Sequence, residues 1–136
     1  MHDRIVSKIK KLLSSSVSKK LPGEIKVVFL SPREARKLNF IYRGKSKPAN
    51  VLSFFYGSEY GEILICQEIV KKEAKEQGNS QDFQMTWMIA HGILHLAGVH
   101  HDEGSRVQAY RFFEFEKKIL AKFFKKARNH NLGSGV

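Results

Sequence analysis

The stretch FQMTWMIAHGILHLAGVHHD, residues 83–102, carries four of the six histidines of the chain in its most apolar part. No Asp, Glu, Lys or Arg occurs from Phe83 to Val99. Because apolar residues fall on nearly every side, this segment predicts a buried central helix over Phe83–Ala97, which Gly98 ends in a left-handed turn. The run is short for a membrane span, so we expect no membrane insertion.

The segments around this helix predict a mixture of helices and strands. A capping pattern of Ser31, Pro32 and Glu34 marks one helix start. A stripe of Phe112, Phe115, Ile119 and Phe123 predicts that the last helix packs on the core. The expected order is helix 3–17, strand Ile25–Leu30, helix Pro32–Tyr42, strands Val51–Tyr56 and Glu62–Cys66, and helices 67–77, Phe83–Ala97 and about Ser105–Ala127.

This order predicts an α+β fold, in which a small mixed β-sheet packs with about five helices. The 136 residues suit one domain, which we expect over residues 1–128. Residues 129–136 are polar and small and are expected to form a disordered tail. The single cysteine, Cys66, excludes an internal disulfide and suits the cytoplasm, and residues 1–20 lack the apolar core of a secretory signal.

The chain is strongly basic, with 24 Lys and Arg against 13 Asp and Glu and a formal charge of +11. Such an excess attracts polyanions, either nucleic acid or an anionic membrane surface. The basic residues form three clusters: Lys8, Lys10, Lys11, Lys19 and Lys20; Arg33, Arg36, Lys37, Arg43, Lys45 and Lys47; and Lys117, Lys118, Lys122, Lys125, Lys126 and Arg128. Clustering favours a polyanion partner over a surface that is merely soluble.

The spacing of the histidines predicts a metal site on the central helix and the loop after it. His91 and His95 are four residues apart, so a helix places both rings on one face. Beyond the turn at Gly98, His101 can approach the same ion from another side. Three protein ligands that leave one position for water are typical of catalytic zinc, so we predict one Zn²⁺ per chain.

The same spacing, with Gly98 between the second and third histidine, is that of the metzincin metalloproteases. Those enzymes carry a glutamate directly after the first histidine, which acts as the general base. Here that position is Gly92. The chain therefore lacks the general base expected of a metalloprotease, which makes peptide hydrolysis the weaker hypothesis.

Two further motifs accompany the segment His91–His101: the run LNFIYRGKSKPANVLSF over residues 38–54, and Gly61–Cys66 with the helix that follows it. In order and spacing the three motifs resemble those of the YbeY family of bacterial endoribonucleases. The resemblance implies zinc held by His91, His95 and His101, a functional arginine at Arg43, and a cleft beside a small sheet. It also implies cleavage of single-stranded RNA, in maturation of the 16S rRNA 3′ end and in ribosome quality control.

The chain departs from the family pattern at several positions. His100 stands where the family usually has Asp, and Ser46, Ala49 and Phe55 replace residues common in the family. The chain also opens on a helix where the family has a strand, so we expect a sheet that is one strand smaller. His100 as a fourth ligand would close the zinc site, which leaves open the alternative of a non-catalytic ribosome-binding protein.

The resemblance suggests a mechanism in which Arg43 pairs with the scissile phosphate, because the guanidinium group binds phosphate in a bidentate manner. Activation of the nucleophile is open between the metal alone, Asp102 and His100. The sequence does not determine the oligomeric state.

Overall fold

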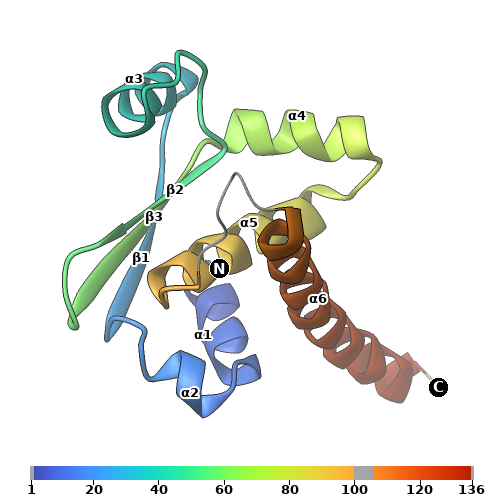
Figure 1. Ribbon diagram of the computed structural model, residues 1–136. Coiled ribbons are helices and arrows are strands. Elements are labelled where there is room, and N and C mark those ends of the chain that lie inside the picture. The colour runs from blue at the N-terminus through green and yellow to red at the C-terminus, as the bar shows by residue number, and fades with distance from the viewer. Residues whose placement is uncertain (1, 100–105, 136) are drawn as a thin grey trace.

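The structure is a computed structural model that describes residues 2–99 and 106–135, with side chains as far as Lys125 (Figure 1). The described chain contains helices and three strands that form one small mixed sheet, which confirms the predicted α+β fold. The elements are α1 His2–Leu12, α2 Ser15–Ser18, β1 Glu24–Phe29, α3 Pro32–Arg43, β2 Val51–Phe55, β3 Tyr60–Ile65, α4 Gln67–Gln77, α5 Gln81–Leu96 and α6 Arg106–Gly135.

The sheet is mixed and has the strand order β1-β3-β2. β1 pairs with β3 in parallel and β2 pairs with β3 in antiparallel fashion. Ile63 therefore lies at the centre of the sheet, with Val27 beside it on one strand and Ser53 beside it on the other. The two antiparallel strands are joined by a short link in which Gly57 has a φ of 131°, a conformation that favours glycine.

Helix α5 lies across one face of this sheet and forms the centre of the larger core (Figure 1). Ile63 of β3 and Ile89 and Ile93 of α5 are fully buried there. Helices α1 and α6 pack against α5 and against each other, and α1 also contacts β1. The other face of the sheet carries a smaller apolar cluster in which Leu52 and Leu64 pack with Leu38 of α3.

The helix boundaries follow the predicted signals closely. The backbone NH of Glu34 donates to Ser31 Oγ at 3.1 Å and the backbone NH of Ser31 donates to Glu34 Oε1 at 3.0 Å, which completes the predicted capping box. Gly98 has a φ of 80° and ends α5 as predicted. The hydrogen bonds from Gly98 N to His95 O and from Val99 N to Leu94 O complete a Schellman turn there.

Two helices differ from the prediction. The helix expected over residues 3–17 is split, because Ser14 adopts an extended conformation with ψ of 155° at the N-cap position of the separate α2. The described residues thus form six helices, one more than expected. The backbone of α6 continues past Ala127, where the sequence predicts its end, and the disorder expected for residues 129–136 stays a prediction.

The buried side of α6 also differs from the predicted phenylalanine stripe. Phe112 and Ile119 are buried as expected, but Phe115 is 36% exposed. Glu116 takes its place on the buried side, where the residue is only 4% exposed.

Within residues 2–99 and 106–135, no helix combines the length and hydropathy needed to span a bilayer.

Candidate active site

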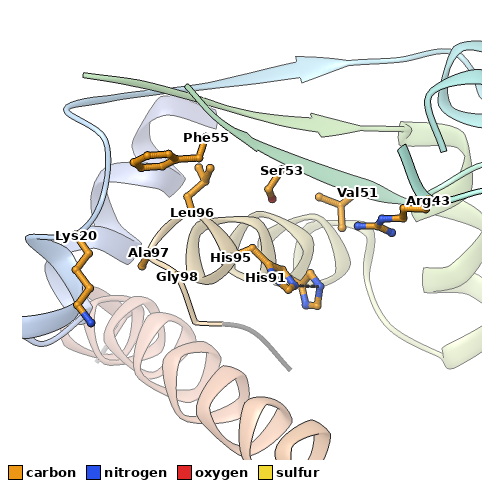
Figure 2. A pocket seen from close by; sticks show the side chains of 10 residues that line it. All are labelled: Lys20, Arg43, Val51, Ser53, Phe55, His91, His95, Leu96, Ala97 and Gly98. Carbon is orange, nitrogen blue, oxygen red and sulfur yellow. Dashed lines mark hydrogen bonds between the residues drawn. The ribbon is translucent and has the colours of Figure 1, made fainter. Parts of the chain in front are cut away.

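A cleft of about 440 Å³ lies between strand β2 and the carboxyl-terminal half of α5 (Figure 2). Strand β2 contributes Val51, Ser53 and Phe55 to its wall, and these alternate residues share one face of the strand. Helix α5 contributes His91 and His95, and the turn that follows contributes Ala97 and Gly98. The cleft thus contains the first two of the three histidines predicted to bind metal.

His91 and His95 lie on successive turns of α5 with their Nε2 atoms 3.1 Å apart. Two imidazole ligands at about 2.0–2.1 Å from a tetrahedral zinc ion have nitrogens about 3.3 Å apart. The two rings are therefore spaced as ligands of a single ion would be. Both rings also contact Phe112 of α6, with ring centroids 5.1 Å away in each case. The apolar ring limits the directions in which the two imidazoles can turn.

The other ring nitrogen of His91 meets a buried carboxylate that the sequence analysis missed. His91 Nδ1 lies 3.0 Å from Glu116 Oε2. The same oxygen accepts a hydrogen bond of 2.9 Å from Trp87 Nε1. A sequence signal did exist, because Glu116 lies four residues after Phe112 and three before Ile119, within the register of the buried stripe. A carboxylate in such a register indicates a buried polar contact.

Arg43 lies at one end of the cleft, near His91, whereas Lys20 lies at the opposite end (Figure 2). Arg43 is the last residue of α3, which ends because Gly44 adopts a left-handed conformation with a φ of 69°. Asn39 Nδ2 donates to the carbonyl oxygen of Lys47 at 2.8 Å and so holds the following loop against the helix. The predicted functional arginine and the histidine pair are thus brought to one cleft by α3 and α5.

The third predicted ligand, His101, lies outside the described residues, as do His100 and Asp102. In residues 2–99 and 106–135, no group of three His, Cys, Asp or Glu side chains is placed to hold a metal ion. The donor set of His91, His95 and His101 therefore stays a prediction, for which the described pair has suitable chemistry and spacing. Cys66 is buried directly after β3 and is not among the residues that line the cleft.

Gly92, the position at which a metzincin carries its general base, faces the sheet. A Cβ atom there would lie 2.8 Å from Ile63 Cγ2 and 3.1 Å from Ile63 Cδ1. Both distances are too short for carbon atoms in contact, and Ile63 is fully buried. A glutamate at this position would displace the centre of the sheet, so the packing argues against the metalloprotease hypothesis.

The fold and the cleft define an α+β protein whose central helix presents a histidine pair to an open cleft beside a mixed sheet. The family model described as Endoribonuclease YbeY matches residues 1–124, and the chain belongs to this family. Its resemblance to that family, predicted from three motifs, is thereby confirmed.

Individual relatives agree with this assignment. The chain is 38% identical over 109 residues to Endoribonuclease YbeY of Chelativorans sp. (strain BNC1), a match that covers 74% of the chain and 66% of the relative. It is 36% identical over 108 residues to Endoribonuclease YbeY of Aquifex aeolicus (strain VF5), covering 75% and 71%. The solution structure of TM1509 from Thermotoga maritima is 30% identical, with a TM-score of 0.59 over 94% of this chain and 87% of that one.

Proposed function

We propose that the chain is a zinc-dependent endoribonuclease that cleaves single-stranded RNA. The observation that carries this proposal is the convergence of His91, His95 and Arg43 on one cleft. Family membership supports the endoribonuclease activity. The proposed cellular role is maturation of the 16S rRNA 3′ end and ribosome quality control, in the cytoplasm.

His91 and His95 would hold the ion together with His101. Zinc bound there would supply Lewis acidity toward water and toward a phosphoryl oxygen. Arg43 would bind the scissile phosphate, since its planar guanidinium forms paired hydrogen bonds to phosphate oxygens. Its place at the His91 end of the cleft suits this role, because Arg43 and the two histidines line the same cavity.

The cleft and its surroundings also suit an RNA strand. Lys20 and Arg43 lie at opposite ends, so a phosphate backbone that follows the cleft meets a cation at each end. Contacts of this kind give affinity without sequence information. The exposed ring of Phe55 lines the same cleft and offers a surface on which a base can stack.

The experiment that tests this proposal measures zinc per chain in untagged wild-type protein and in His95→Ala, followed by cleavage of a single-stranded RNA. We expect one zinc per wild-type chain and almost none in the variant, together with loss of cleavage. His2→Ala is the matched control, because His2 lines a different pocket beside α1. Wild-type protein that takes up no zinc when zinc is offered would contradict the proposal. So would zinc-loaded protein that binds RNA without cleaving it, which is the behaviour of a structural zinc protein.

A further inference from the structure

His91 lies between two cavities, and each of its two ring nitrogens faces one of them. Its Nε2 approaches His95 on the side of the cleft. Its Nδ1 approaches Glu116 on the side of a second cavity of about 220 Å³. The polar residues that line this second cavity come from α4, α5, α6 and the residue before β2; they are Asn50, Glu73, Gln77, Gln84, Trp87, His91 and Glu116.

The contacts of Glu116 determine where the proton of His91 resides. An indole Nε1–H can only donate, so Glu116 Oε2 is the acceptor in its bond to Trp87. A carboxylate can only accept, so the contact of 3.0 Å with His91 requires the proton on Nδ1 of the ring. A neutral imidazole with that proton has its lone pair on Nε2. That nitrogen lies 3.1 Å from His95 Nε2, on the side of His91 that faces the cleft.

We propose that Glu116 is a positioning residue that fixes both the tautomer and the ring orientation of His91, so that Nε2 is available to a metal in the cleft. The role of Glu116 toward a metal rests on the proposed function, whereas the tautomer of His91 does not depend on it. Carboxylates that hold the second nitrogen of a ligating histidine raise its basicity and fix its direction. Because Glu116 belongs to α6 and His91 to α5, correct packing of α6 becomes a requirement of the site.

A purely structural role for Glu116 makes a different prediction. In that case the carboxylate would serve only to satisfy the NH of Trp87 and to pack the two helices. Its removal would lower stability and leave His91 unchanged. The proton of His91 is therefore the property that separates the two roles.

The first measurement is the tautomer of His91 in metal-free protein, read from the ¹⁵N shifts of the imidazole nitrogens at mildly alkaline pH. We expect the Nδ1–H form in wild-type protein and its loss in Glu116→Ala. Glu116→Gln should retain the wild-type form, because one amide oxygen can accept both bonds that Oε2 accepts now. Wild-type His91 in the Nε2–H form would overturn the inference, whether or not any variant folds and whether or not zinc binds.

The second measurement is zinc affinity, determined by competition with a chelator. We expect Glu116→Ala to bind zinc about 10–100-fold more weakly than wild-type protein. Glu116→Gln should fall between the two, because it keeps the hydrogen bonds and loses the charge. Glu114→Gln is the matched control: it removes a carboxylate from the exposed side of α6, where Glu114 pairs with Lys117 at 3.3 Å, and should bind like wild type.

The outcomes distinguish this inference from the proposed function. Wild-type zinc affinity in a folded Glu116→Ala protein would overturn the positioning role and leave the zinc site intact. Wild-type protein that binds no zinc would contradict the proposed function, and the tautomer would still decide the role of Glu116. Emission of Trp87, the only tryptophan, reports in every variant whether α6 still packs at this place.

Discussion

The two sides of helix α5 differ in what determines their residues. On one side Gly92 fits against β3, and Leu96, which also lines the cleft, packs against Gly61. On the other side His91 and His95 face the cleft and contact α6 through polar atoms and the ring of Phe112. Shape determines the residues on the first side, and hydrogen bonding determines them on the second. Substitutions on the first side should therefore change stability, and those on the second should change metal binding and catalysis.

The largest effect on the cleft side is expected from Arg43→Ala. We predict a loss of about a hundredfold in RNA cleavage, since removal of one charged donor to the reacting group typically costs that much. Zinc content and the free energy of unfolding should stay at the wild-type values, because Arg43 is an exposed residue at the end of α3. The measurement is single-turnover cleavage of a single-stranded RNA by zinc-loaded protein.

Arg36→Ala is the control for Arg43→Ala. Arg36 lies on the same helix and lines a different pocket with Arg33 and Lys37, so it should change cleavage far less. Equal losses in both variants would show that α3 acts only through its total charge. Cleavage by Arg43→Ala at the wild-type rate would remove Arg43 from the mechanism.

The next effect is expected on the sheet side of α5, from Gly92→Ala. The added Cβ would lie 2.8 Å from Ile63 Cγ2, so either the helix or the sheet must shift. We predict a loss of about 1–3 kcal/mol in the free energy of unfolding, the usual cost of overpacking a core. Denaturant unfolding of metal-free protein measures this loss.

The double variant Gly92→Ala with Ile63→Ala tests whether the contact is the cause. Ile63→Ala alone should cost about 2–5 kcal/mol, because Ile63 is fully buried. In that background the added methyl group enters the space that Ile63 has left, so its cost should shrink or change sign. Strictly additive costs would show that Gly92 is needed for a reason other than its distance from Ile63.

The same division explains what the sequence could predict. Helix caps and apolar periodicity depend on neighbouring residues, and the predicted capping box and the turn at Gly98 are confirmed. The His91–His95 pair was likewise readable, because four-residue spacing on a helix determines its geometry. The contact between Glu116 and His91 joins residues 25 positions apart on two helices. Apolar periodicity within one helix does not report such a contact. The prediction that Phe115 lies on the buried side of α6 was wrong, because Glu116 occupies that side.

The smallest effect is expected from Ser53→Ala, because Ser53 both lines the cleft and contacts the backbone of α5. Its side chain lines the cleft, and its Oγ donates to the carbonyl oxygen of Gly92 at 3.2 Å. We predict a loss of about 0.5–1.5 kcal/mol in the free energy of unfolding, the usual net value of one hydrogen bond. Ser58→Ala, at an exposed position in the link between β2 and β3, is the control and should lose less. A loss of stability alone would assign Ser53 to the sheet side of α5, as an anchor between β2 and the helix. Slower RNA cleavage at unchanged stability would assign its hydroxyl to the substrate, and the division between the two sides would then not extend to β2.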